Sequence, residues 1–294
     1  MDGSFIELNG QPFYVRTWGN AGNPPLLMLH GFPEFGDAWR DLAPYLADHF
    51  HCIAPDQRGY GQSWAPEGAQ NYTLSKLVSD MAALIEHTHA PCTVLGHDWG
   101  ASVAYGLAMF RPDLIDRLII ANGVHPAPFQ RAMASGGAQS KASQYINQLR
   151  APDAAQHLSA NNFAKLEQFF RHGMGVDWLS DAAMEDYRTE WARPRRLNAM
   201  LNWYRASPLV VADPGTPRND LPELSPDRLR VNCPHLLLWG PNDMALLPES
   251  TAGLEDFAPN LTRITIPDTD HWLHHQNPHA IARAILDWTQ QNPT

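Results

Sequence analysis

Apolar residues occur along the chain in short, nearly continuous runs, and each run ends in glycine or in polar residues. Runs of this kind are typical of strands that are buried on both faces of a parallel sheet. The runs cover residues 25–29, 92–95, 118–121, 235–239 and 261–266. Between them, apolar positions repeat with helical spacing, as over 75–87 and 101–110. The alternation predicts an α/β fold with a sheet between two layers of helices.

The beginning of the chain has a different pattern. Two segments rich in apolar residues, Phe5 to Leu8 and Pro12 to Trp18, flank the dipeptide Asn9-Gly10. Asn-Gly allows a positive φ at both central positions of a tight turn, so a β-hairpin is predicted here.

The alternation of strands and helices stops between about residues 125 and 230. The helical patterns in this stretch lie at 142–149, 163–172, 181–192 and 197–206. A proline-rich connector from Pro208 to Pro226 follows, and strand patterns resume at Leu236. We therefore predict a core domain formed by 1–124 and 231–294, with a helical cap domain, 125–230, inserted into it.

Charge and cysteine content restrict the class of protein. The chain has 31 acidic and 21 basic residues, which gives a formal net charge of −10. Such a surface repels nucleic acid and anionic membranes, so we expect neither as a partner. The N-terminus has no basic stretch followed by an apolar one, and no apolar stretch has the length of a membrane span. The cysteines are odd in number and far apart, which favours buried thiols and a cytoplasmic location.

The run Gly96-His97-Asp98-Trp99-Gly100 lies between a strand pattern and a helical pattern. It has the form of the strand–turn–helix elbow Gly-x-nucleophile-x-Gly, with Asp where esterases have Ser. The glycines let strand and helix approach closely, which holds Asp98 in a strained turn with its side chain exposed. The alternative is an Asp98 that only caps the following helix.

An aspartate at this position changes the chemistry. A serine that attacked an sp³ carbon would leave an ether, which a neighbouring histidine could not hydrolyse. A carboxylate that attacks the same carbon leaves an ester, which a base-activated water can hydrolyse. Asp98 therefore predicts a two-step displacement at carbon through a covalent alkyl-enzyme ester.

The partners of such a nucleophile follow in the expected order of nucleophile, acid and histidine. Asp243 follows the strand pattern 235–239, and His271 follows the pattern that ends at Ile266. We predict His271 as the general base and Asp243 as the residue that orients it. Several other histidines are interpreted as solvated or hydrogen-bonded, because no group of them has the spacing of metal ligands. These are the histidines at 87, 89, 274, 275 and 279.

The predicted oxyanion hole comes from two backbone amides. The residue after the nucleophile and the loop after the strand 25–29 supply these amides in elbow enzymes. They would be the N–H groups of Trp99 and Phe32, because Pro33 has no N–H to donate.

Together these residues resemble the α/β-hydrolase superfamily and, within it, the epoxide hydrolases. The resemblance covers nearly the whole chain and includes segments 30–34, 56–63 and 122–126. It implies an α/β-hydrolase fold with a mostly parallel, eight-stranded sheet flanked by helices, and a helical cap inserted after the sixth strand. It also implies a cis bond between Phe32 and Pro33 and no cofactor or metal.

The resemblance further implies two cap tyrosines that donate protons to an opening epoxide. Segments 143–149 and 201–205 match those of epoxide hydrolases and place Tyr145 and Tyr204 in this role, with Tyr187 as a further candidate. The departing alkoxide needs such a donor, since it is a poor leaving group. His30, Pro33 and Trp203 are expected beside a small apolar epoxide, in a monomer or a homodimer.

Two other functions remain open at this stage. Haloalkane dehalogenases also have Trp after the nucleophile, but their residue after the His-Gly pair usually has a side-chain donor, which Phe32 does not. Fluoroacetate dehalogenases have an Arg beside the nucleophile, where this chain has Trp99. A receptor of the same fold without turnover is expected to have an incomplete triad, and here the triad is complete.

Overall fold

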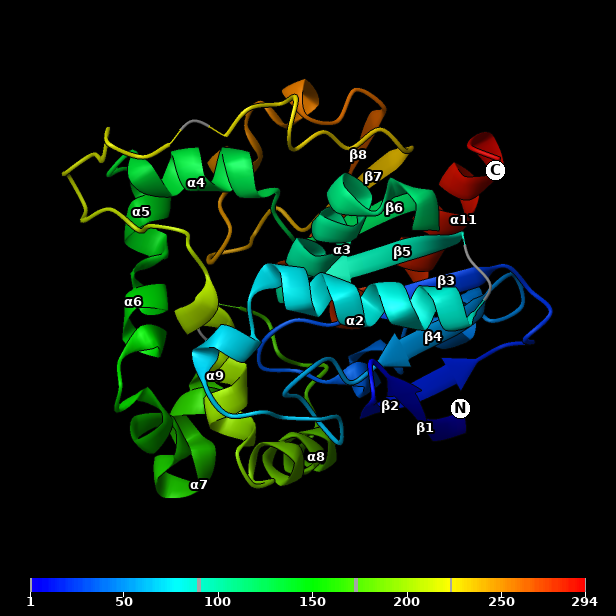
Figure 1. Ribbon diagram of the computed structural model, residues 1–294, viewed down its shortest axis with the longest axis horizontal. Helices are drawn as coiled ribbons and strands as arrows, with labels where there is room; N and C mark the ends of the chain where they lie inside the picture. Colours follow the sequence, from blue (N-terminus) through cyan, green and yellow to red (C-terminus); the bar gives the residue numbers. More distant parts are fainter. Residues whose placement is uncertain (1, 89–90, 172–173, 223, 294) are drawn as a thin grey trace.

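The computed structural model describes residues 2–88, 91–171, 174–222 and 224–293. Its centre is one eight-stranded sheet in the order β1-β2-β4-β3-β5-β6-β7-β8 (Figure 1). Only the pairs β1–β2 and β2–β4 are antiparallel. The strands are β1 (Asp2–Leu8), β2 (Gln11–Trp18), β3 (Pro25–Leu29), β4 (His51–Pro55), β5 (Cys92–His97), β6 (Ile115–Ala121), β7 (His235–Trp239) and β8 (Leu261–Thr265). The predicted mostly parallel sheet and the hairpin at its start are confirmed.

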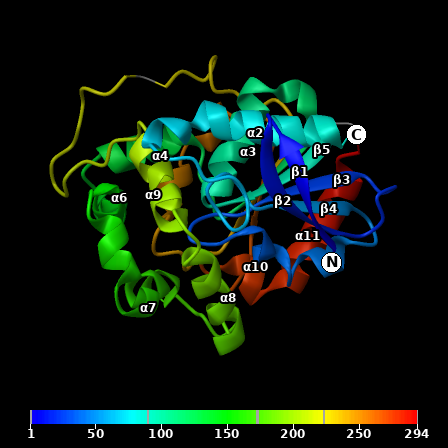
Figure 2. The ribbon, with the colours of Figure 1, turned by 60° about the horizontal axis from the view of Figure 1, so that its bottom comes forward.

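Helices cover both faces of the sheet. Figure 2 shows α2 (Leu74–His87) and α3 (Trp99–Phe110) on one face, and α10 (Leu273–Gln276) and α11 (Pro278–Gln291) on the other, where α1 (Ala43–Leu46) also packs against α11. Along β3, Leu27 and Leu29 belong to the core on the α2–α3 side, and Leu26 and Met28 to the core on the α11 side. Burial on both sides explains why the strand patterns are nearly continuous in apolar residues.

Strand β4 was not predicted. The apolar residues of this strand are the three central ones, Cys52-Ile53-Ala54, and its ends are His51 and Pro55. Those three residues nevertheless divide between the two cores, Ile53 on one side and its neighbours on the other. A buried strand can thus be too short to leave a periodic pattern.

The described residues between β6 and β7 form six helices, most of which lie on the left in Figure 1. They are α4 (Pro126–Ala134), α5 (Ala138–Ala142), α6 (Gln144–Arg150), α7 (Ala154–Arg171), α8 (Asp181–Trp191) and α9 (Arg196–Ala206). The pattern at 163–172 predicted only the second part of α7. The last residue of this pattern, 172, lies outside the described residues. Helices α4 and α5 were not predicted. The described residues of 207–234 form no helix or strand. The division into core and cap domains stays a prediction.

Two further sequence expectations concern cysteines and membranes. Cys52, Cys92 and Cys233 are all free in the part of the chain that the structure describes, and the first two are buried. Among the described residues, no helix combines the length and the apolar character that crossing a membrane requires.

Candidate active site

Asp98 lies in the turn between β5 and α3, with φ 49° and ψ −120°. This conformation is rare for a residue with a side chain, and strained residues of this kind gather at functional sites. The flanking glycines permit the turn: a Cβ at Gly100 would collide with the carbonyl oxygen of Leu29, and a Cβ at Gly96 would lie 2.7 Å from the carbonyl oxygen of Gly100. The Asp98 side chain makes no capping hydrogen bond to α3, a helix described over its whole length, so the alternative of a simple helix cap is not supported.

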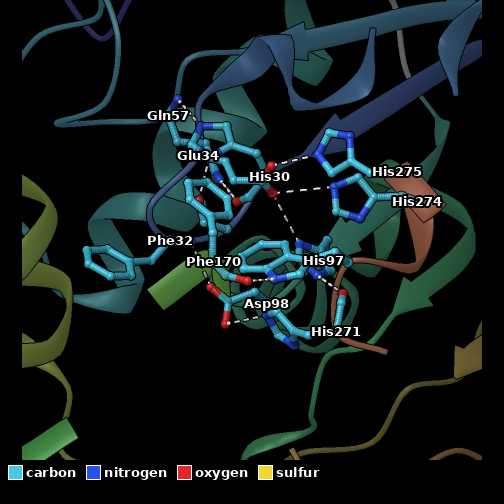
Figure 3. Close-up of polar contacts among 12 residues, drawn as sticks. His30, Phe32, Glu34, Gln57, His97, Asp98, Phe170, His271, His274 and His275 are labelled. Atoms are coloured by element: carbon cyan, nitrogen blue, oxygen red, sulfur yellow. Dashed lines mark hydrogen bonds and ion pairs between the residues drawn. The ribbon is translucent and has the colours of Figure 1, made fainter. Parts of the chain in front are cut away.

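The predicted oxyanion donor Phe32 contacts Asp98 directly. Its backbone N–H donates to Oδ1 of Asp98 over 2.8 Å. The bond between Phe32 and Pro33 is cis, as predicted. The amide of Trp99, the second predicted donor, lies at the start of α3, one residue after Asp98. One carboxylate oxygen is therefore held by a backbone donor, and the other points toward His271 (Figure 3).

His271 and Asp243 come together with Asp98 at the carboxyl ends of the strands. Nδ1 of His271 donates to Oδ2 of Asp243 over 2.8 Å, and Nε2 of His271 lies 3.7 Å from Oδ2 of Asp98. The other oxygen of Asp243 accepts hydrogen bonds from the amides of Ala245 and Leu246. Asp243 thus fixes the tautomer of His271 so that Nε2 faces Asp98.

The charges at this site determine which groups are protonated. Burial lowers the pKa of His271, but the carboxylates of Asp243, Asp98 and Glu34 outweigh it and raise this pKa to about 9. Burial alone would raise the pKa of Asp243, yet His271 and the amide of Asn122 hold it below the usual range. The acid is therefore ionised, and the histidine is the group whose proton can change.

Tyr145 on α6 and Tyr204 on α9 line the same cavity as Asp98. Their ring centroids are 6.4 Å apart, and the ring of Tyr204 also packs edge-on against Trp99 and Phe32. Burial, and then the charge of Asp98, raise the pKa of both phenols. Both tyrosines therefore keep their hydroxyl protons and can donate them. The apolar part of the cavity is formed by Val124, Phe129, Ile146, Leu209 and Leu246.

Comparison with known proteins agrees with this arrangement. The sequence model of the α/β hydrolase fold family matches residues 24–278 of this chain. This chain belongs to that family. It is 32% identical to the AB hydrolase superfamily protein YfhM of Bacillus subtilis, over 98% of this chain and 99% of the relative. It is 30% identical to human epoxide hydrolase 4, over 97% of this chain and 76% of the relative. A solved epoxide hydrolase from metagenomes of hot environments superimposes with a TM-score of 0.88 at 33% identity, over 98% of both chains.

These matches identify the chain as a hydrolase and place it in the epoxide hydrolase family of α/β hydrolases. The predicted fold and family are therefore confirmed.

The three residues expected beside the substrate have other contacts in this hydrolase. His30 is buried, accepts a hydrogen bond from the amide of Gln57, and contacts the carbonyl oxygen of Gly31. Burial lowers its pKa to about 4. The indole N–H of Trp203 donates to the carbonyl oxygen of Arg58, and the carbonyl oxygen of Pro33 accepts from the indole N–H of Trp191. None of the three is among the described residues that line the cavity, and their contacts instead position the loops around it.

The role of Asn122 was not predicted from the sequence. Its side-chain Nδ2 donates to Oδ2 of Asp243 over 2.7 Å, and its side-chain Oδ1 accepts from the backbone N–H of Gly240. Asn122 thus holds the orienting acid and the loop that carries it. The available signal was its position directly after β6, at the edge of the sheet where α/β enzymes collect their sites.

Proposed function

We propose that this hydrolase opens epoxides to vicinal diols through a covalent ester on Asp98. The observation that carries the proposal is the position of two tyrosines, Tyr145 and Tyr204, in the same cavity as a carboxylate at a nucleophile elbow. The apolar lining of the cavity favours a small apolar substrate. Relatives and structural neighbours named epoxide hydrolases support the same reaction.

In the first step, Oδ2 of Asp98 attacks one ring carbon and the bond between that carbon and the ring oxygen breaks. The ring oxygen takes a proton from Tyr145 or Tyr204 as its charge develops. Oδ1 of Asp98 remains bound to the amide of Phe32. Such fixed donors lower the free energy of the transition state without rearranging during the reaction.

In the second step, Nε2 of His271 takes a proton from water, and the resulting hydroxide attacks the carboxyl carbon of the ester. The 3.7 Å between Nε2 and Oδ2 of Asp98 is too long for a hydrogen bond, so the base is not occupied by the nucleophile. The amides of Phe32 and Trp99 would stabilise the oxyanion of the tetrahedral intermediate. Its collapse breaks the bond between the carboxyl carbon and the alkyl oxygen, which takes the proton held by Nε2 of His271 and leaves as part of the diol. The proton that remains on the carboxyl group restores the tyrosine that donated in the first step.

A single turnover in ¹⁸O-water tests this route. With enzyme in excess over styrene oxide, we expect unlabelled diol and one ¹⁸O atom in the carboxyl group of Asp98, found by mass spectrometry of its peptide. The reason is that water enters the product only through the carboxyl group. Label in the diol of the first turnover, with none in Asp98, would contradict the ester intermediate.

The tyrosines provide a separate prediction. Changing Tyr145 or Tyr204 to Phe removes one donor and is expected to slow ester formation about 10²-fold, with a larger loss in the double variant. Rapid-mixing measurement of ester formation separates this effect from ester hydrolysis. The variant Tyr45→Phe is the control, since Tyr45 is exposed and outside the cavity. Ester formation at the unchanged rate in the double variant would remove the tyrosines from the mechanism.

The charges around His271 predict a pH dependence. Only neutral His271 can accept a proton from water, so ester hydrolysis is expected to slow as pH falls through the pKa of His271. In the free enzyme the charge of Asp98 helps to raise this pKa to about 9, but esterification removes that charge. We therefore expect the rate of ester hydrolysis to reach half of its maximum at a pH below 9. This rate is measured as diol release in a single turnover. A rate that rises as pH falls would exclude His271 as the base.

A dehalogenase that uses the same nucleophile stays the second candidate. The indole of Trp99 packs edge-on against the ring of Tyr204, with the ring centroids 5.1 Å apart, so a hydroxyl donor lies beside this residue in the cavity. That contact favours an oxygen leaving group over a halide. Halide release from haloalkanes at a rate above that of diol formation from styrene oxide would reverse the order of the two candidates.

A further inference from the structure

A cluster of buried titratable side chains lies beside the catalytic residues. Its centre is the carboxylate of Glu34, toward which His274, His275 and His97 all point (Figure 3). Glu34 and the three histidines are all buried. From sequence, His274 and His275 were interpreted as solvated or hydrogen-bonded residues without the spacing of metal ligands. The fold instead brings them together with a residue from the loop after β3.

The two oxygens of Glu34 have different surroundings. Oε1 accepts hydrogen bonds from Nε2 of His275 and from the hydroxyl of Tyr187, each over 2.8 Å. Oε2 has no hydrogen-bond partner among the described residues, although it lies 3.3 Å from Nε2 of His274. Both ring nitrogens of His274 are also without a partner in the described part of the chain. Buried polar atoms are rarely left in this state, which indicates that the cluster accommodates another group.

His97 adds an independent observation. Its Nε2 lies 2.8 Å from the carbonyl oxygen of His271, which can only accept a hydrogen bond, so Nε2 carries the proton. In the neutral ring, Nδ1 is then a bare acceptor, and it faces Oε2 of Glu34 at 3.6 Å. Nδ1 also has no partner among the residues that the structure describes. Two acceptors that face each other repel unless a proton or a metal cation lies between them.

The spacing of the donor atoms suits a transition metal. Tetrahedral zinc binds nitrogen and oxygen at about 2.0–2.2 Å, which places neighbouring ligand atoms about 3.3 Å apart. Nε2 of His274 and Oε2 of Glu34 are separated by 3.3 Å. One ligand atom from each of Glu34, His274 and His275 lies within 4.8 Å of the other two. Two imidazoles and one carboxylate favour Zn²⁺ over Mg²⁺ or Ca²⁺, which prefer oxygen ligands.

We propose that Glu34, His274 and His275 form a binding site for a zinc-like divalent metal ion, with one coordination position left to water. Nε2 of each histidine and the carboxylate of Glu34 would be the ligands. Metal binding replaces the proton that His275 shares with Glu34. The site would join α10, which follows the loop of His271, to the loop that carries Phe32.

The surroundings of His275 match those of a metal-bound histidine. Its Nδ1 lies 3.1 Å from Oδ2 of Asp41, which leaves Nε2 for the metal. Its ring stacks on Trp178, with the centroids 3.9 Å apart and the planes within 5°. Asp41 is 46% exposed at its side chain, so the cluster is separated from solvent by a single side chain on this side.

Zinc binding to the chain without a histidine tag tests the proposal without relying on activity. After treatment with a chelator and dialysis, we expect one Zn²⁺ per chain by calorimetry and a Tm that rises with Zn²⁺ but not with Mg²⁺. Co²⁺ is expected to give the visible absorption of a tetrahedral site. A wild-type protein whose Tm does not respond to Zn²⁺ would overturn the proposal, because the cluster would then hold only a proton or water.

Three variants locate the bound metal. Asp41→Asn keeps all three ligands and is expected to weaken zinc binding about 10–100-fold, whereas His274→Gln should weaken it further. His279→Gln is the matched control, because His279 is exposed and outside the cluster, and its zinc affinity should not change. If circular dichroism shows that His274→Gln does not fold, the zinc affinity of Asp41→Asn alone decides whether the metal binds at the Glu34 cluster. Zinc binding that is lost in Asp98→Asn but unchanged in Asp41→Asn would place the metal at the catalytic residues and overturn the proposal.

Discussion

Replacing His271 with Gln is expected to stop the proposed reaction after its first half. Attack by Asp98 does not require a base, and the donors Phe32, Tyr145 and Tyr204 remain in place. Hydrolysis of the ester does require a base, since Nε2 of His271 is the group that activates water. The variant should therefore consume one equivalent of epoxide and retain it as an ester.

The expected measurement is a gain in intact mass equal to one substrate molecule, located on the peptide that contains Asp98. Diol release should fall by about 10²–10⁴-fold, the usual contribution of a general base. His279→Gln is the control for a histidine lost elsewhere, and it should turn over normally. Normal diol release from His271→Gln would assign the base to another residue and require a different second step.

The parallel core could be predicted from sequence because burial on both faces leaves nearly continuous apolar runs, as in β3 and β7. Strand β4 could not be predicted in this way, since its three apolar residues are too few to show a pattern. Helical spacing was also interrupted within α7, where residues 160–163 leave the helical conformation. Asn161 and Asn162 there adopt positive φ, which Asn tolerates better than most residues, so no Gly or Pro marks the break.

The candidate site residues could be predicted from sequence for a different reason. The elbow is a contiguous motif, and Asp243 and His271 each follow a recognisable strand, so topology alone brings them to one edge of the sheet. The contacts of Asn122 and the Glu34 cluster depend on how separate loops pack against one another. Neither spacing nor periodicity carries that information. The hydrogen bond from Tyr187 to Glu34, for example, joins residues that are 153 positions apart in the sequence.

Replacing Asp98 with Asn is expected to abolish turnover, with a loss of about 10⁴–10⁶-fold, as for other essential members of catalytic triads. The amide has nearly the shape of the carboxylate, and its oxygen can still accept the hydrogen bond from Phe32. It is neutral, however, and is not a nucleophile toward an epoxide carbon. Neither diol nor an ester should form, which distinguishes this variant from His271→Gln, in which the ester accumulates.

The neutral side chain at position 98 should also change His271. Because the charge of Asp98 contributes to raising the pKa of His271, this pKa is expected to fall below 9 in Asp98→Asn, as measured by NMR titration of the ring. Asp268→Asn is the matched control, because Asp268 is exposed and has a positive φ that Asn tolerates. Intact mass must verify that the introduced asparagine has not deamidated back to aspartate during storage. Ester formation by a verified Asp98→Asn protein would mean that another group attacks the epoxide. An unchanged pKa of His271 would mean that the charge of Asp98 does not act on this histidine.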